Sequence, residues 1–299
     1  MTAPSRGALL RMAAGAALIS TTSIFVRWAH VSPTLSAFWR MAFGAAMLLV
    51  LLFARRQSRS FALRDYAWML LPALAFASDL FVWHRSIAYI GPGLATLAAN
   101  FQVFILAIVG VMFFHERVNA RFVLGVALAL FGLWLLVGTG WSSFTPQFRF
   151  GVGLGLFTGV CYAVYLLSLR RAQAVRPQLT PVRALFLNSL LSAAILGIVV
   201  LGEGGGFAIP DAQSWAALLG LGFFGQVLGW VLIAGAMPKL PASLVGLLLL
   251  LQPALSFVLD VILFARPTSS LDWLGLALSL VGIFIGSMRG KPAPVGEPA

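Results

Sequence analysis

Ten apolar stretches follow one another along the chain, separated by short breaks that contain Pro, Gly or charged residues. A helix needs about 20 apolar residues to cross a bilayer, so each stretch predicts one transmembrane helix. Charged residues make up 9% of the 299 positions, against about 25% in soluble domains, which excludes a soluble chain. The sequence therefore predicts an all-α integral membrane protein with ten transmembrane helices. The stretches span about 7–27, 35–54, 66–87, 93–114, 121–138, 151–170, 183–201, 213–236, 242–264 and 272–288.

The positive charges predict how these helices are oriented. Of the 20 Lys and Arg residues, 15 fall in loops and ends on the side of the amino terminus, four on the other side, and Arg40 within a helix. Positive loops stay in the cytoplasm, so we expect both termini there. The net charge of +12 is then a consequence of topology. Because the cations are scattered over short loops, no nucleic-acid partner is expected.

The chain contains an internal repeat. A shift of about 150 residues lays its fourth and fifth apolar stretches over the ninth and tenth without a gap. Matching Leu residues are common in such a sequence, but matching Gln and Gly residues are not. The informative pairs are Gln102/Gln252, Gly125/Gly275 and Gly132/Gly282. The predicted units are a first five-helix repeat at 1–145, a second at 146–290, and a Pro-rich, disordered tail at 291–299.

Five helices are an odd number, so the second repeat must enter the membrane from the opposite face. The loop charges agree: the loop after the second helix carries four Arg residues, and its counterpart after the seventh carries no Lys or Arg. Inverted repeats are a recurrent design of secondary transporters, with the substrate site near mid-membrane between the halves. A duplication that serves only packing is the alternative. We expect a transporter that works by alternating access.

The sequence resembles the EamA-type members of the drug/metabolite transporter superfamily over essentially all of residues 7–288. The resemblance rests on Ala88-Tyr89-Ile90-Gly91-Pro92-Gly93, Phe113-Phe114-His115-Glu116-Arg117, Leu240-Pro241-Ala242-Ser243, Gln252-Pro253 and the glycines above. Arg40 resembles the arginine of the family's second helix. Gln102-Val103 and Arg266 depart from the family, which often has a proline and an acidic residue there. The resemblance implies ten helices, a central cavity and export of small metabolites without ATP, and overall it is greatest to the YddG-type amino-acid exporters.

Few ionisable residues fall within the predicted helices, and each is a functional candidate because a charge in the bilayer is costly. Arg40 either snorkels to the outer interface, or forms a structural ion pair, or contacts substrate. Asp79 lies deeper, where it can pair with Arg40 or serve as a proton or amine site. Asp260 lies near the outer end of the ninth predicted helix and is expected to pair with a neighbour such as Arg266 or Arg85.

Uncharged polar and aromatic residues complete the predicted site. Each polar side chain must face another helix or a wet cavity. The symmetry-related Gln102 and Gln252 favour a shared site for polar groups of the substrate, although interhelical bonds alone are the alternative for any single residue. Aromatic rings can hold an apolar side chain or lie over an ammonium group. The residues predicted to bind substrate are Asp79, Asn100, Gln102, Tyr162, Tyr165, Trp230 and Gln252.

The sequence lacks a phosphate-binding loop, an H-E-x-x-H motif and a nucleophile with a spaced base, so neither a cofactor nor a metal is expected. A neutral or zwitterionic solute with an apolar side chain fits best. Together with the resemblance, this predicts export of amino acids with apolar or aromatic side chains. One alternative is a carrier of nucleotide sugars or other polar metabolites, although one Arg and no Lys lie within the predicted helices. Another is an intramembrane enzyme on lipid-linked substrates, with Asp79 and His84 as acid and base. The expected partners are the small-molecule substrate and the lipid bilayer, and a monomer is compatible with the sequence.

Overall fold

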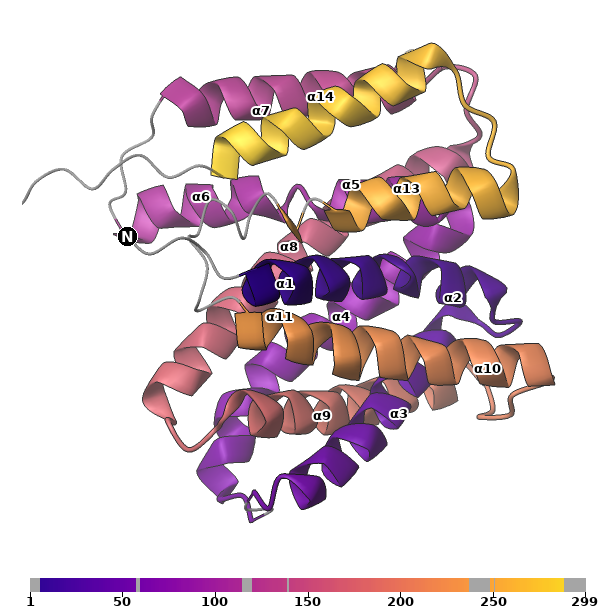
Figure 1. Cartoon of the computed structure of the whole chain (residues 1–299). Helices are drawn as coiled ribbons and strands as arrows, with labels where there is room; N and C mark the ends of the chain where they lie inside the picture. Colours follow the sequence, from indigo (N-terminus) through magenta and orange to yellow (C-terminus); the bar gives the residue numbers. More distant parts are fainter. Residues whose placement is uncertain are drawn as a thin grey trace, which may run out of the picture.

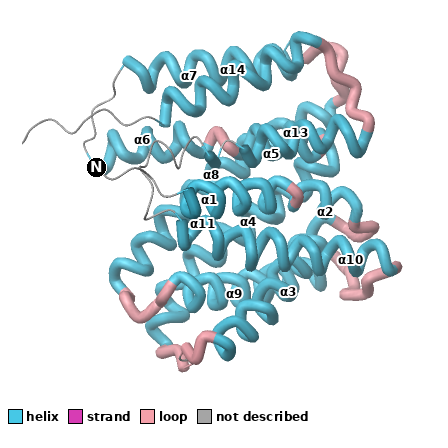
Figure 2. Tube along the Cα trace, viewed as in Figure 1, coloured by secondary structure: helices cyan, strands magenta, loops and turns pink. Residues whose placement is uncertain are grey.

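The computed structural model describes residues 6–57, 60–114, 120–138, 140–236, 248–249 and 251–287, and these residues form helices without any strand (Figures 1 and 2). The predicted tail at 291–299, and Glu116 and Leu240 to Ser243 of the family resemblance, lie outside them. The helices are α1 (Arg6–Ser20), α2 (Thr22–Trp28), α3 (Pro33–Ala54), α4 (Leu63–Ile90), α5 (Pro92–Ala99), α6 (Gln102–Phe114), α7 (Ala120–Leu133), α8 (Pro146–Val175), α9 (Pro181–Gly202), α10 (Ala212–Gly220), α11 (Trp230–Ala236), α13 (Leu251–Phe264) and α14 (Ser270–Ser287), with π-helical segments η1 (Trp134–Gly138) and η2 (Leu221–Gly229).

Six helical segments are long and apolar enough to span a membrane. Four further apolar helices within the described residues are shorter. The long segments are Arg6–Trp28, Pro33–Ala54, Leu63–Ile90, Pro146–Val175, Pro181–Gly202 and Ala212–Ile233, and the shorter ones are Pro92–Leu106, Val123–Leu136, Leu251–Phe264 and Ser270–Ile285. The chain is thus an all-helical, multi-pass membrane protein, and the count of ten complete spans stays a prediction.

Ser/Thr-Pro pairs start three of the long helices. Ser32 Oγ accepts a hydrogen bond from Leu35 N (3.2 Å) ahead of Pro33, and Thr145 Oγ1 accepts one from Phe148 N (3.2 Å) ahead of Pro146. Thr180 occupies the same position before α9. The hydroxyl satisfies an amide that the helix leaves free, and proline fits the first helical position because its missing donor is not needed there. These caps set the helix starts two to five residues before the apolar stretches begin.

Two of the predicted helices are interrupted near their middles. Thr21 separates α1 from α2, where the hydroxyls of Ser20, Thr21 and Thr22 each donate to a carbonyl three residues back, at 2.6–2.7 Å. Such bonds compete with the helix backbone. Asn100 and Phe101 separate α5 from α6, and Asn100 Nδ2 donates to Thr96 O (2.8 Å). Discontinuous helices are where transporters often build their binding sites.

The helix pairs follow the repeat. α3 packs on α9 and α7 on α14, and each of these two pairs joins helices related by the shift. α5, in the fourth predicted helix, packs on α13, in the ninth. α4 packs on α8, and its counterpart is the packing of α1 on η2 and α11. In Figure 1, α7 and α14 lie side by side at one edge of the bundle and α3 and α9 at the other. The main contacts between the two sequence halves among the described residues therefore recur when the halves are exchanged.

The matched glycines lie where α7 crosses α14. A Cβ on Gly132 would come within 2.5 Å of Gly275 O, and one on Gly282 within 2.6 Å of Gly125 O. Ser279 Oγ donates to Ala129 O (3.2 Å), which is itself 150 positions earlier. Small residues let two backbones approach closely in a membrane, so these glycines serve helix packing. Gly151, Gly155 and Gly159 do the same where α8 meets α4 and α5.

Candidate functional site

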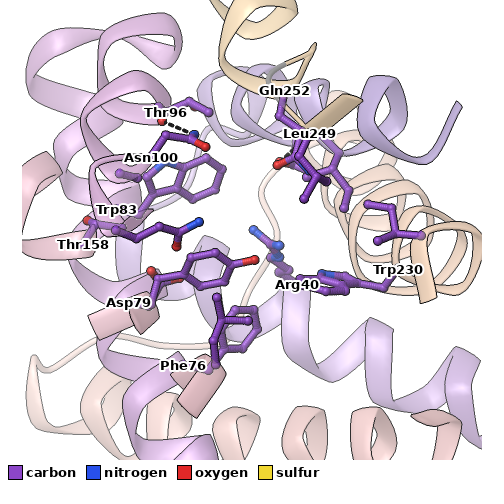
Figure 3. A pocket seen from close by; sticks show the side chains of 17 residues that line it. Arg40, Phe76, Asp79, Trp83, Thr96, Asn100, Thr158, Trp230, Leu249 and Gln252 are labelled. Atoms are coloured by element: carbon purple, nitrogen blue, oxygen red, sulfur yellow. Dashed lines mark hydrogen bonds between the residues drawn. The ribbon is translucent and has the colours of Figure 1, made fainter. Parts of the chain in front are cut away.

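A cavity of about 230 Å³ lies in the interior of the bundle, where both sequence halves meet. Figure 3 shows Asp79, Trp83 and Asn100 on one side of it and Trp230, Leu249 and Gln252 on the other, with Arg40 between them. Its lining comes from α1, α2, α3, α4, α5, α6, α8, α11 and α13, and from Asn100 and Leu249. The lining residues are Ile19, Thr22, Arg40, Phe76, Asp79, Trp83, Thr96, Ala99, Asn100, Gln102, Thr158, Tyr162, Leu166, Trp230, Ile233, Leu249 and Gln252.

Six of the seven residues predicted to bind substrate line this cavity: Asp79, Asn100, Gln102, Tyr162, Trp230 and Gln252. The seventh, Tyr165, does not reach it. The ring of Tyr165 is fully buried, with its centroid 4.4 Å from that of Phe76 and 5.9 Å from that of Tyr162. Tyr165 therefore supports two rings of the cavity wall from behind.

Arg40 and Asp79 bring opposite charges to the cavity without forming an ion pair with each other. Their exposed fractions are 5% and 6%, and no N–O distance between them is within 4.0 Å. The Arg40 guanidinium carbon lies 5.6 Å from the Trp83 ring centroid and 5.9 Å from that of Phe76, within cation–π range. Arg40 Nε and Asp79 Oδ1 have no hydrogen-bond partner among the described residues. Both side chains thus keep unused hydrogen-bonding capacity next to the cavity.

The amides of the cavity come from symmetry-related positions. Gln102 is the first residue of α6 and Gln252 the second of α13, and the Gln102 Oε1 atom is buried without a partner in the described part of the chain. Two further polar residues of the helices, Gln226 and Asn188, are not among the lining residues of the cavity. Gln226 Nε2 donates to Ser189 Oγ (3.1 Å), and Asn188 is fully buried on α9. Gln226 therefore joins helices, which was the alternative for each polar residue.

Some lining residues escape sequence reasoning. Phe76 precedes Asp79 by three positions and Trp83 follows it by four, so the three share one face of α4. Thr158 and Leu166 flank Tyr162 on α8 at the same helical spacing. Helical spacing from the predicted residues Asp79 and Tyr162 is the signal that could have identified Phe76 and Thr158. Snorkelling to the outer interface was one of three alternatives for Arg40, beside an ion pair and a substrate contact, and the structure buries the side chain beside the cavity.

At the end of the bundle opposite α1's first residue, buried polar contacts join α2, α5 and α13. Ser256 Oγ lies 2.5 Å from Ser23 Oγ and 3.2 Å from Thr96 Oγ1. Asp260 Oδ2 accepts a hydrogen bond from Gly93 N (3.0 Å) and forms an ion pair with Arg266 (3.4 Å), which confirms the predicted pairing. A Cβ on Gly93 would lie 2.7 Å from the Phe257 Cα, so α5 and α13 touch there. Thr96 also lines the cavity, so these contacts begin directly beside it.

The pair proposed for an intramembrane enzyme is not assembled around the cavity. Asp79 lines it, but His84 is 1% exposed and is absent from the lining. The His84 ring packs edge-on against Trp83, with centroids 5.3 Å apart. An acid and a base acting on one substrate would both have to reach it.

Two segments of the chain, residues 6–138 and 149–288, match the EamA-like transporter family. The chain belongs to this family. The two matched segments correspond to the two predicted repeats, and members of the family are transporters, so the chain is a transporter and not an enzyme. The family match and the resemblance read from the sequence motifs thus lead to the same family.

Its relatives are bacterial transporters. The threonine/homoserine exporter RhtA of Salmonella typhimurium is 27% identical over 252 residues, which cover 83% of this chain and 79% of RhtA. The uncharacterized transporter YyaM of Bacillus subtilis is 23% identical over 86% of this chain and 85% of YyaM. An uncharacterized transporter of Haemophilus influenzae is 29% identical, but the match covers only 42% of this chain and 43% of that protein. A protein crystal structure at 20% identity has the same fold, with a TM-score of 0.67 over 96% of this chain and 99% of that one.

Proposed function

We propose that the chain exports amino acids, preferentially those with apolar or aromatic side chains, by alternating access and without ATP. It acts as a secondary or facilitative transporter in a bacterial inner membrane, with ten spans and both termini in the cytoplasm. The two five-helix repeats, 1–145 and 146–290, move relative to one another around the central cavity. The resemblance to RhtA, an amino-acid exporter, supports the substrate class.

The observation that carries this proposal is the presence of one cation and one anion beside one cavity, without an ion pair between them. An amino acid offers a carboxylate to Arg40 and an ammonium group to Asp79. Its side chain then lies among Phe76, Trp83 and Trp230, whose rings favour apolar contact. The amides of Gln102 and Gln252 complete the set of polar groups in both halves.

Flux from liposomes tests the proposal. Purified protein is reconstituted, and the efflux of radiolabelled phenylalanine, leucine and threonine down a gradient is followed. We expect saturable flux that falls at least tenfold in Arg40→Gln and in Asp79→Asn, because each removes a charged hydrogen bond of about 1.5–3 kcal/mol. Arg170→Gln, an exposed arginine of α8, is the control and should match the wild type. Flux that is unchanged in the double variant Gln102→Ala/Gln252→Ala would remove those amides from the site.

The same vesicles distinguish the remaining possibilities. Transport of a nucleotide sugar but of no amino acid would favour the alternative cargo, although only one cation lines the cavity to receive a diphosphate. Imposing a pH gradient tests the driving force. Flux that responds to the gradient in wild type and not in Asp79→Asn assigns a proton to that carboxyl group, and flux indifferent to pH indicates a facilitated uniporter.

A further inference from the structure

A second pocket, of about 330 Å³, lies away from the central cavity, at the end of the bundle where α1 and α9 begin and α3 and α11 end. Helices from both sequence halves form it, and it shares no lining residue with the central cavity. Its lining residues are Arg11, Arg55, Gln57, Thr180, Pro181, Val182, Leu185, Val231, Leu232 and Gly235.

Two arginines line this pocket, and no described acidic group neutralises their charges. Arg11 and Arg55 are exposed, and neither has an ion pair or a hydrogen bond from its side chain to any described residue. No Asp or Glu is among the lining residues. The pocket therefore has a net positive charge that no described group neutralises, and an anion is the chemistry that it fits.

Local structure holds the rim of the pocket in place. At the end of α3, Gln57 N donates to Leu52 O (3.0 Å) and Arg56 N to Phe53 O (3.0 Å), with Arg56 at φ 50°. This is the Schellman arrangement, which closes a helix with one left-handed residue. Thr180 Oγ1 then donates to Gln57 Oε1 (2.9 Å), which ties the end of α3 to the start of α9. The α9 amino terminus adds its partial positive charge to that of the arginines.

The rest of the pocket is apolar. Val182 and Leu185 are 5% and 6% exposed, and Val231 and Leu232 of α11 are half-buried beside them. A free phosphate ion makes no favourable contact with an apolar wall. A phospholipid, by contrast, places its charged headgroup at the helix ends and its acyl chain along the helices. Basic pockets between transmembrane helices bind anionic lipid headgroups for this reason.

We propose that this pocket binds an anionic phospholipid, with the phosphodiester between Arg11 and Arg55 and an acyl chain along Leu185 and Leu232. The chemistry recognised is a phosphate that carries one negative charge and an attached apolar chain. The site is independent of the exported substrate. It also lies on α11, whose Trp230 and Ile233 line the central cavity while Val231, Leu232 and Gly235 line this pocket.

Native mass spectrometry of the full chain in detergent tests the proposal, with phosphatidylglycerol, phosphatidylcholine and inorganic phosphate as probes. We expect phosphatidylglycerol to remain bound at a defined stoichiometry and phosphatidylcholine to dissociate. Arg11→Gln and Arg55→Gln should each weaken the lipid about fivefold, and the double variant about 25-fold, at about 1 kcal/mol per arginine. Arg64→Gln removes an exposed arginine that is not among the lining residues and should bind like the wild type.

Three results would overturn the assignment. One is equal retention of the two lipids by the wild type, a comparison that does not depend on any variant folding. Another is full retention of phosphatidylglycerol by a double variant that elutes as the wild type does. The third is thermal stabilisation by inorganic phosphate equal to that by the lipid, which would assign a soluble anion instead. Loss of lipid binding with amino-acid flux intact would support the lipid site and leave the proposed function standing.

Discussion

An aspartate at the start of a long helix joins the sequence halves at each end of the bundle, but the two junctions differ in chemistry. At the end where α1 begins, Asp65 Oδ1 accepts a hydrogen bond from Arg176 Nε (2.8 Å). At the other end, Asp211 Oδ2 lies 3.0 Å from His30 Nδ1. A shift of 146 positions carries Asp65 onto Asp211 and His30 onto Arg176. The repeat thus places an acid and a base at corresponding positions and varies only the base.

Burial makes the first junction the stronger of the two. The Asp65 side chain is 2% exposed and also accepts from Gln178 Nε2 (3.1 Å) and Ala62 N (3.0 Å), whereas the side chains of Asp211 and His30 are 38% and 58% exposed. Exposed pairs contribute little, and buried carboxylates with several donors contribute more. Guanidinium keeps its charge at all physiological pH values, but imidazole does not. One end is therefore joined by an arginine–aspartate ion pair and the other by a histidine–aspartate contact.

The largest expected effect comes from Asp65→Ala. The change removes an acceptor with three donors and leaves the partly buried Arg176 without its counter-ion, at a cost of about 2–3 kcal/mol. We expect the melting temperature in detergent to fall by several degrees. Asp211→Ala is the matched control at the other end and should lower it less. Equal effects of the two variants would show that burial does not set the difference.

Asp260 lies at the end of the bundle opposite the first residue of α1 and offers a second test of how the two ends differ. There Asp260 bonds to Gly93 and Arg266, and the position 150 residues before Asp260 is Gly110, which has no side chain to form such a bond. Asp260→Ala removes charged hydrogen bonds, so we expect this end to open about tenfold more often. The measurement is labelling of Thr158→Cys, in a Cys161→Ser background, by a membrane-impermeant maleimide added from that side.

A matched variant controls for general loosening of the bundle. Asp65→Ala should leave labelling of the same cysteine from that side unchanged, because Asp65 lies at the other end. If both variants raise labelling equally, the bonds of Asp260 do not close this end specifically.

Hydropathy predicted most of the fold, but not its interruptions. The stretch 35–54 became Pro33–Ala54, since helix ends in a membrane follow the apolar run and its Ser/Thr-Pro caps. The stretch 93–114 was predicted as one helix, and the structure breaks it at Asn100 and Phe101. Apolar residues continue through the break, so hydropathy carries no signal there. What marks it is one side-chain amide, Asn100 Nδ2, bonded to Thr96 O.

For the site, too, the sequence predicted some residues and could not place others. Polar side chains are rare within the predicted helices. Asp79, Gln102 and Gln252 were predicted as site residues because each is costly in hydrocarbon and has to face a cavity or a partner. The same argument could not place Tyr165, since an aromatic ring is stable both in a cavity wall and behind it. It also left Arg40 undecided, because its distance from the helix end fits snorkelling as well as burial. Only packing against Phe76 and Trp83 distinguishes the two.

Exchanging the bases sharpens the comparison of the two junctions. Arg176→His gives the buried junction the chemistry of the exposed one. A histidine beside a carboxylate has a raised pKa, so it stabilises the fold below its unfolded value of about 6.5 and loses this contribution as the pH rises through the folded value. We expect the variant to approach the wild type at pH 5.5 and to be less stable by roughly 1–2 kcal/mol at pH 8.5. Thermal melts at both pH values measure this, and a constant difference would contradict it.

The smallest expected effect concerns acid at the exposed junction. The backbone N–H of Ser214 and the His30 side chain hold the pKa of Asp211 below its ordinary value of 3.8. A carboxyl group with a lowered pKa stabilises the fold above its unfolded value and loses this contribution as the pH falls through the folded value. We expect Asp211→Asn to melt slightly below the wild type at pH 6, and the difference to shrink as the pH falls below 3.8 and through the lowered pKa of the wild-type carboxyl group. If the difference does not shrink at all as the pH is lowered, the asparagine acts through lost helix capping and not through the charge.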